Sequence, residues 1–246
     1  MKSITATLVA ITVCSIQSLY GQASPAASPA ATAGGPAKRG DVYSITFIHG
    51  AAGKATALGE WAKKSLSSAP AGEHQMLLRH EAGSPWDYVA VAHIGAKATV
   101  EPTGNPAGQA LKPLMDWHDD TFVNGPSWAE FAKAMDLDES TGKPKTNESV
   151  YVISVYRPMT GQEDAVESFL NEAPTAGDLT AGHVFFQHLE GGAWRFCDIT
   201  RYKNYADYGK SEAVAVAETA KGSSNWFKLR DLCSFHNDTV AAAIAP

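Results

Sequence analysis

The sequence has little positive charge. Its 20 lysine and arginine residues are outnumbered by 26 aspartate and glutamate residues, which gives a formal net charge of −6. Nucleic-acid-binding proteins carry basic patches or stripes that neutralise phosphates, and no such stripe occurs here. The composition therefore argues against a nucleic-acid partner.

Cysteine is also scarce. The chain has three cysteines, Cys14, Cys197 and Cys233, and no CxxC pair or Cys/His cluster with the spacing of a zinc site. Cys197 and Cys233 either form a disulfide in an oxidising compartment or remain as buried thiols.

Several catalytic motifs are missing. The sequence contains no GxSxG elbow, P-loop, HExxH, or GxGxxG after a strand. These absences argue against the hydrolases, nucleotide-binding enzymes and metalloproteases that depend on those motifs.

Beyond the N-terminal region no run is long and apolar enough to cross a membrane. Residues 1–23 have a lysine, an apolar run and then small residues, which predicts a secretory signal peptide. A lipid anchor on Cys14 is the rival, although Val13 is bulkier than the small residue expected there. Residues 24–40 are rich in Ala, Pro and Gly, and predict a disordered linker. We expect a periplasmic or secreted protein that is not membrane-bound after cleavage.

The remaining chain repeats itself. A shift of 108 residues aligns VYSITFIH, from Val42, with VYVISVYR, from Val150. The register continues without a gap through three further pairs: His80 with His188, Gly83 with Gly191, and Trp86 with Trp194. The first copy then carries about ten extra residues before the HxDT segment that both copies share. We interpret this pattern as a duplication.

Both copies show the same local patterns. VYSITFIH and VYVISVYR alternate as strands do. Residues 53–66 and 161–173 place apolar residues at helical spacing, and residues 74–94 and 183–202 each predict a hairpin around a glycine turn. In the second copy a helix follows, with Asn204 as its N-cap.

This order predicts an α+β fold of two tandem ferredoxin-like repeats, residues 41–146 and 147–246, packed as an α/β-barrel pseudo-dimer within one chain. No fourth strand is evident after HxDT in either copy. The C-terminal DTVAAAIAP instead favours a helix.

Four histidines and two aspartates recur at related positions. His80 and His188 lie near the ends of predicted strands, and His118 and His236 begin the HxDT segments, where Asp120 and Asp238 follow. A strand histidine and an HxDT histidine, oriented by the aspartate, would make a general acid/base site in each repeat. Alternatively, Asp and Thr form a local cap and the histidine fills a packed corner.

Aromatic residues recur as well. Trp86 and Trp194 follow the glycine turns, and Tyr88 and Phe196 follow two residues later. They either line an apolar substrate pocket, to which we add Arg201, or form the core. No two histidines have a fixed ligand spacing, so we predict no metal.

The segment VYVISVYRPMTGQEDAVESFL, the turn QHLEGGAW and the helix starts SWAEF and NYADY resemble the dimeric α/β-barrel superfamily. NIPSNAP-like, stress-responsive-barrel and antibiotic-biosynthesis-monooxygenase-like domains are the most similar members. SWAEF follows HxDT in the first copy, whereas NYADY precedes it in the second.

Residues 1–23 predict that the protein is exported. The resemblance implies that it binds an apolar or aromatic small molecule and catalyses cofactor-independent monooxygenase or isomerase chemistry. A non-enzymatic stress-related binding module is the alternative. A haem-binding barrel, with His118 or His236 as ligand and Arg201 as distal group, is a further one. We predict no cofactor and leave homo-oligomerisation open.

Overall fold

The computed structural model describes residues 39–67, 72–96, 111–172, 179–222 and 224–244. The predicted signal peptide and residues 24–38 of the predicted linker lie outside the described residues, as do residues 97–110 of the stretch 95–110, where the first copy carries its extra residues.

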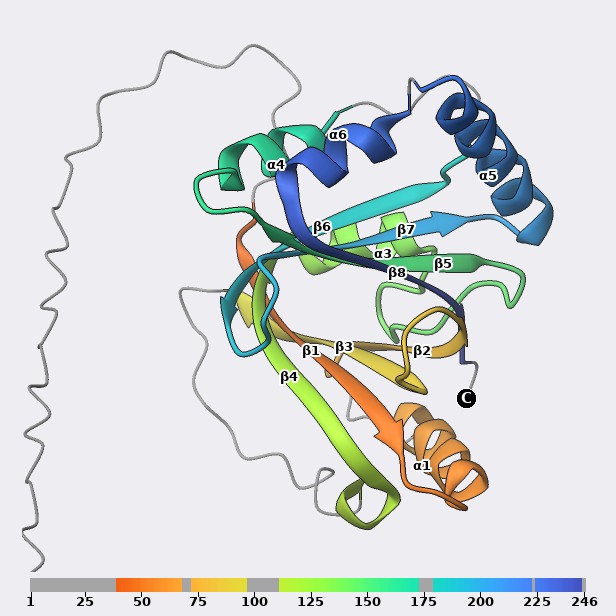
Figure 1. The fold of residues 1–246 in the computed structure, drawn as a ribbon. Helices are drawn as coiled ribbons and strands as arrows, with labels where there is room; N and C mark the ends of the chain where they lie inside the picture. The colour runs from red at the N-terminus through yellow and green to blue at the C-terminus, as the bar shows by residue number, and fades with distance from the viewer. Residues whose placement is uncertain (1–38, 68–71, 97–110, 173–178, 223, 245–246) are drawn as a thin grey trace, which may run out of the picture. The chain divides into compact units, whose positions relative to one another are not determined.

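The described residues form eight antiparallel strands that close into a barrel in the order β1-β3-β2-β8-β5-β7-β6-β4 (Figure 1). The strands are β1 (Asp41–Gly50), β2 (Gln75–Ala82), β3 (Tyr88–Ala96), β4 (Met115–Gly125), β5 (Val150–Pro158), β6 (Gly182–Glu190), β7 (Phe196–Tyr202) and β8 (Cys233–Ala243).

Each repeat supplies half of the barrel. The first contributes the order β4-β1-β3-β2, and the second contributes β8-β5-β7-β6. The halves join where β2 pairs with β8 and where β4 pairs with β6. This arrangement confirms the predicted α+β fold of two tandem ferredoxin-like repeats packed as a barrel within one chain.

The fourth strands are the HxDT segments themselves, so the expectation that they are missing was wrong. β4 pairs with β1 over most of its length, and β8 pairs with β5 from Cys233 to Ala242. The C-terminal alanines favour a helix intrinsically. Pairing of β8 with both β5 and β2 overrides that preference, because the backbone is bonded on both sides.

Five α-helices and one 3₁₀ helix are described. They are α1 (Ala55–Ser67), η1 (Lys112–Leu114), α3 (Trp128–Met135), α4 (Glu163–Leu170), α5 (Tyr205–Ala220) and α6 (Asn225–Leu232). Asn204 caps α5 as predicted, because its side chain accepts a hydrogen bond from the amide of Asp207 at 2.9 Å. A capping box of Ser127 and Glu130 starts α3.

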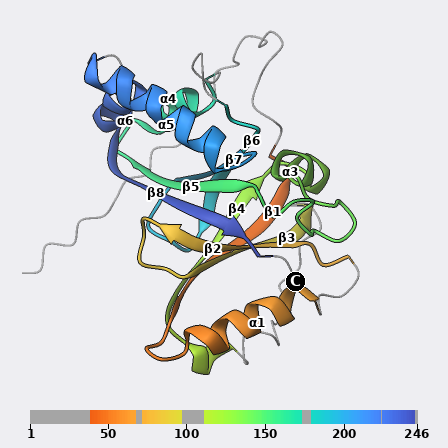
Figure 2. The ribbon, with the colours of Figure 1, turned by 90° about the vertical axis from the view of Figure 1, so that its right-hand side faces the viewer.

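The helices differ between the two halves. α1 lies beside the first half of the barrel, whereas α4, α5 and α6 gather at the second half (Figures 1 and 2). Leu58 and Ala62 of α1 pack on the outer side of the first half, and Val166 of α4 and Leu229 of α6 pack on the second. Helix α3 follows β4, and α5 and α6 precede β8, as the positions of SWAEF and NYADY indicated.

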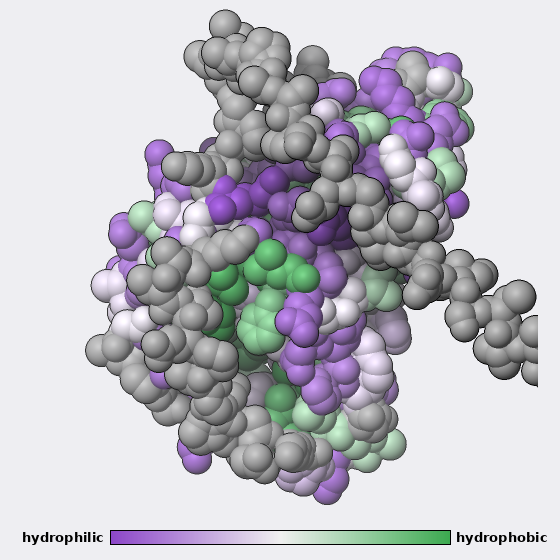
Figure 3. All heavy atoms as spheres, turned by 90° about the vertical axis from the view of Figure 1, so that its left-hand side faces the viewer, coloured by the Kyte–Doolittle hydropathy of each residue, from purple (hydrophilic) through white to green (hydrophobic). Residues whose placement is uncertain are grey.

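The largest core cluster fills the barrel interior. Its members include Tyr43, Phe47, Ile153 and Phe186, all buried. Apolar side chains also reach the surface, where Figure 3 shows them gathered in the middle of one face and bordered by hydrophilic residues.

The two remaining cysteines are free and buried. Cys197 belongs to the interior cluster, and Cys233 belongs to the cluster beneath α4 and α6. Burial raises the pKa of both thiols, which makes them poor nucleophiles. None of the described helices is long and apolar enough to cross a membrane.

Candidate functional site

The threonines of the two HxDT segments point into the barrel and are almost fully buried. The Thr121 hydroxyl accepts a hydrogen bond from the Gly192 amide at 2.9 Å, and the Thr239 hydroxyl accepts one from the Ser84 amide at 3.3 Å. Each threonine therefore holds the hairpin turn of the other repeat.

The histidines and aspartates of HxDT lie on the outer side of the barrel wall, because side chains alternate along a strand. His118 pairs with Asp120 at 2.8 Å, and His236 pairs with Asp238 at 2.7 Å. The first pair is about half-exposed, with side chains 46% and 52% accessible. The local cap is thus made by the threonines, while the aspartates engage their own histidines.

His80 and His188 lie on the inner side. Their rings approach the indoles of Trp86 and Trp194, with centroids 5.7 and 6.0 Å apart. The Nε2 atoms of both histidines are buried without a hydrogen-bond partner among the described residues. The strand histidines and the HxDT histidines are therefore separated by the barrel wall and do not meet in one cavity.

The predicted pocket residues are also distributed over different places. Trp86 and Trp194 belong to the interior core, Tyr88 packs beneath α1, and Phe196 packs beneath α4 and α6. The Arg201 guanidinium donates to the carbonyl oxygens of Ala134 and Ala181 at 2.9 and 3.2 Å. A role for these residues in binding substrate stays a prediction.

A polar cluster that the sequence did not suggest lies on the outer face of the second half. Asp198 of β7 is 6% exposed. Its Oδ2 accepts a hydrogen bond from the Tyr156 hydroxyl at 3.2 Å and lies 3.3 Å from Nε2 of His183. Its Oδ1 is buried and has no hydrogen-bond partner among the described residues. A buried carboxylate with an unsatisfied oxygen is energetically unfavourable, and such groups concentrate at functional sites.

Tyr156 links this cluster to the HxDT segment. Its ring stacks on His236 with centroids 4.9 Å apart and an interplanar angle of 6°. Burial raises the pKa of Tyr156 well above its usual value, and the carboxylates of Asp198 and Asp238 add to the shift. Tyr156 therefore stays protonated and donates to Asp198.

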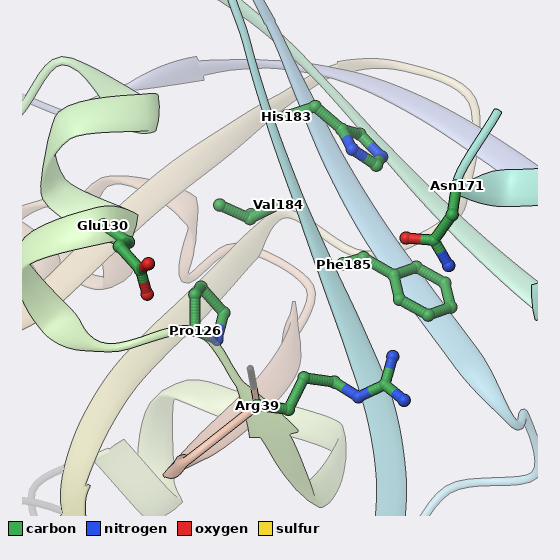
Figure 4. Close-up of a pocket in the computed structure, with 7 residues that line it drawn as sticks. All are labelled: Arg39, Pro126, Glu130, Asn171, His183, Val184 and Phe185. Carbon is green, nitrogen blue, oxygen red and sulfur yellow. The ribbon is translucent and has the colours of Figure 1, made fainter. Parts of the chain in front are cut away.

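A pocket of about 220 Å³ opens beside His183 (Figure 4). His183 and Phe185 extend from the same side of β6, Asn171 lies beside them at the end of α4, and Glu130 lies on α3. His183 thus connects the pocket to the buried carboxylate of Asp198.

Arg39 supplies positive charge to this pocket. Its guanidinium forms an ion pair with Glu167 and lies over the Phe185 ring, 5.3 Å from the centroid. Its second terminal nitrogen, Nη1, is buried without a hydrogen-bond partner among the described residues. An oxyanion in the pocket would satisfy that donor.

Among the described residues, the first repeat has no equivalent of this cluster at the matching positions, and its own partly buried pair, His93 with Asp41 at 2.8 Å, lies elsewhere. At a shift of 108 residues Tyr156 corresponds to Ile48, Asp198 to Ala90 and His183 to Gln75. The signal in the sequence was the lone Asp198 in the apolar strand FCDIT, where the aligned strand reads YVAVA.

The arrangement of His183 and Asp198 fits a site for proton transfer. Among the described residues no three His, Cys, Asp or Glu side chains form a group that could hold a metal ion. A histidine held by a buried carboxylate is the usual arrangement of a general base.

These features define the fold class: a dimeric α/β barrel built from one chain. Two solved structures share it at a TM-score of 0.55. One is a candidate monooxygenase from Fusobacterium nucleatum, 8% identical, with 83% of this chain and 92% of that chain covered. The other is an anthrone oxidase-like protein, 11% identical, with 84% and 92% covered. No protein-family model and no curated protein match the sequence. At this level of identity the likeness concerns the fold alone.

Proposed function

We propose that the protein binds a small phenol or enol in the pocket beside His183, and that His183 removes its acidic proton. One observation carries this proposal. The buried carboxylate of Asp198 lies beside His183, and the first repeat has neither residue at the matching positions. A duplication copies the residues that the fold requires in both repeats. Asp198 is present in only one repeat, which indicates a role specific to that repeat, such as a functional site.

The pocket chemistry suits such a ligand. Its volume of about 220 Å³ lies below the ~300 Å³ at which sites for drug-sized ligands begin, so a single aromatic ring is the expected size. Phe185 offers a ring face, and Arg39 offers a donor for the phenolate or enolate oxygen.

Proton transfer would proceed from the ligand hydroxyl to the imidazole nitrogen of His183 that does not face Asp198. The negative Asp198 stabilises the resulting imidazolium, and Arg39 stabilises the oxyanion. A hydroquinone bound in this way would give two electrons and two protons to molecular oxygen, forming a quinone and hydrogen peroxide. That reaction is cofactor-independent oxidase chemistry, because no oxygen atom enters the product. The name of one structural neighbour, an anthrone oxidase-like protein, agrees with this class.

Binding is tested with p-nitrophenol, whose phenolate is yellow and whose neutral form is nearly colourless. Near neutral pH the wild-type protein should raise the phenolate fraction above that of the free compound. Substitutions His183→Gln and Asp198→Asn should abolish the increase, whereas the outer-face control His118→Gln should keep it. An unchanged spectrum with the wild-type protein, or an unchanged response in both variants, would refute the proposal.

Oxygen uptake with hydroquinone separates an enzyme from a binding module. Uptake above the uncatalysed rate that disappears in His183→Gln supports catalysis. Phenolate formation without uptake of oxygen would support the alternative, a non-enzymatic binding protein at the same pocket.

We also propose that the protein acts after export, on the basis of residues 1–23. N-terminal sequencing of protein recovered from the periplasm or medium should begin near Ser24. Recovery of the full chain only from the cytoplasm would contradict export.

A further inference from the structure

The carboxylate of Asp198 is contacted from both neighbouring strands. Its strand, β7, lies between β5 and β6 in the barrel. Tyr156 reaches the carboxylate from β5, with its hydroxyl 3.2 Å from Oδ2, and His183 reaches it from β6, with Nε2 3.3 Å from the same oxygen. The other oxygen, Oδ1, has no hydrogen-bond partner among the described residues. The tyrosine and the histidine therefore share one acceptor oxygen.

Both distances are long for bonds to a carboxylate. Such bonds are usually about 2.5–2.7 Å long from a hydroxyl and about 2.7–2.9 Å long from an imidazolium. A hydrogen bond from one donor takes up part of the negative charge of the carboxylate and leaves it a weaker partner for the next. The Tyr156 hydroxyl thus reduces the attraction of Asp198 for a proton on His183.

The Tyr156 hydroxyl is a permanent donor. The side chain is 5% exposed, and burial raises the pKa of the hydroxyl well above its usual value. Its ring is also fixed in place, because His236 lies directly opposite on β8 and stacks on it with centroids 4.9 Å apart. The stack restricts movement of the hydroxyl away from Asp198.

The first repeat lacks this arrangement. His118 lies opposite Ile48, which has no hydroxyl, and Ala90 stands where Asp198 does in the second repeat. A tyrosine stacked on the HxDT histidine therefore occurs in the repeat that has the buried carboxylate.

We infer that Tyr156 is a positioning residue that limits the basicity of His183 through Asp198. Its hydroxyl fixes the carboxylate and takes up part of its charge, so that His183 stays neutral, and able to accept a proton, at lower pH than Asp198 alone would allow. This inference rests on the proposed function, in which His183 is the base, and adds what sets the strength of that base.

Other charged and titratable groups surround this cluster. They are Arg39 and Glu130 at the pocket, Glu167 paired with Arg39, Arg195 over the Phe196 ring, and His236 paired with Asp238. Tyr156→Phe changes none of these charges, because the tyrosine is neutral, and it keeps the ring that stacks on His236. A change in the titration of His183 in this variant therefore reports the loss of the hydroxyl.

NMR titration of the His183 ring in the full chain tests the inference. Tyr156→Phe should raise the pH at which His183 is half protonated by about 0.5–1 unit, a three- to tenfold rise in proton affinity. Tyr151→Phe is the matched control, because Tyr151 is also a buried tyrosine of β5 but donates to the Met135 carbonyl oxygen at 3.0 Å. It should leave the His183 titration unchanged. An unchanged or lowered midpoint in Tyr156→Phe, or an equal rise in Tyr151→Phe, would overturn the inference.

A measurement on the wild-type protein decides the same question if Tyr156→Phe does not fold, which thermal unfolding of each variant reveals. With ¹³C-labelled tyrosine, the Cζ signal of Tyr156 should show a step at the pH where His183 titrates, because both side chains share Oδ2 of Asp198. That step should disappear in His183→Gln. If the signal has no such step, or if the step persists in His183→Gln, the inference fails.

Oxygen uptake with hydroquinone keeps this inference distinct from the proposed function. The acid limb of the pH profile of kcat/KM should shift in Tyr156→Phe by the same amount as the His183 titration. A limb that stays in place while the titration shifts would show that Tyr156 does not act on the reaction, which would overturn the inference. Absence of both oxygen uptake and the p-nitrophenol response would refute the proposed function, while the two titrations would still decide whether Tyr156 controls His183.

Discussion

The two repeats are more alike on the inner face of the barrel wall than on the outer face. On the inner face both repeats keep the same residues at matching places, such as His80 with His188 and Trp86 with Trp194. On the outer face they diverge, since Ala90 of the first repeat stands where Asp198 lies buried in the second. The residues that both repeats share therefore indicate what the closed barrel requires. The residues that differ indicate where a functional site is expected.

The repeated HxDT segment belongs to the first group. Its threonine reaches across to the hairpin of the other repeat, and the backbone beside it meets that hairpin's glycine. Each repeat bonds the hairpin turn of the other through this threonine, so the segment occurs in both repeats. The duplicated motif is thus explained by the fold, without requiring two active sites.

The largest expected effect tests the claim that the two hairpin contacts are equivalent. A Cβ at Gly191 would lie 2.2 Å from the Asp120 carbonyl oxygen, and one at Gly83 would lie 2.5 Å from that of Asp238. Both glycines also have positive φ, +116° and +119°. Gly191→Ala and Gly83→Ala should therefore each lower the free energy of unfolding by about 2–4 kcal/mol in urea titrations.

The controls for this prediction also come from both repeats. Gly53 and Gly161 have φ of +76° and +80°, with no atom within 4 Å of an added Cβ. Alanine at either position should cost about 1 kcal/mol from backbone strain alone. If Gly191→Ala is no more harmful than Gly161→Ala, the close contact between the repeats does not matter for stability.

A smaller effect should separate the two threonines. Thr121→Val removes the acceptor of a 2.9 Å hydrogen bond and Thr239→Val that of a 3.3 Å one, while both keep the side-chain volume. We expect losses of about 1–2 and about 1 kcal/mol, because the amide is left without its partner. Serine replacements, which keep the hydroxyl, are the controls for the hydrogen bond. Valine variants as stable as the wild type would show that these bonds do not hold the hairpins.

Much of the fold could be predicted because its signals are local. The alternation in VYSITFIH, the cap at Asn204 and the glycine turns each lie within a few residues. The fourth strands could not be predicted in the same way. The alanine-rich end of β8 lacks strand propensity, and it is extended because β5 and β2 pair with it.

The candidate site was harder to foresee than the fold. Tyr156 and Asp198 are 42 residues apart, and they meet only because β5 and β7 pair in one register. The histidines that both copies share are conspicuous in the sequence, whereas the polar cluster lies where the copies differ. A comparison of the aligned copies for unmatched charges within strands would have identified Asp198.

The pH dependence of stability should reveal the inner-face histidine of the second repeat. Burial lowers the pKa of His188, and the nearby Arg195 lowers it further. The unfolded chain therefore takes up this proton first, near its ordinary pKa of about 6.5. The contribution of neutral His188 to stability is therefore fully present above that pH. It is lost as the pH falls toward the lower pKa that His188 has in the folded protein.

Urea unfolding at about pH 8 and about pH 5 measures this effect. His188→Gln should reduce the acid loss of stability by up to about 1 kcal/mol. His118→Gln, at an exposed position, is the matched control. NMR titration of the His188 ring should also give a pKa below that of a free histidine. A higher pKa would mean that His188 gains a partner for its charged form.

The smallest effect concerns the His–Asp pairs of HxDT, which are alike in sequence but differ in surroundings. The His236 side chain is 12% exposed and stacks on Tyr156, whereas His118 is 46% exposed. Asp238→Asn should lower the free energy of unfolding by about 0.5 kcal/mol, and Asp120→Asn by about 0.2 kcal/mol or less, since solvent screens the more exposed pair. At about pH 5, where protonated imidazoles make these pairs ionic, added salt should reduce both losses. Equal losses in the two variants would mean that stacking on Tyr156 does not strengthen the second pair, and the link between HxDT and the Asp198 cluster would then be one of proximity alone.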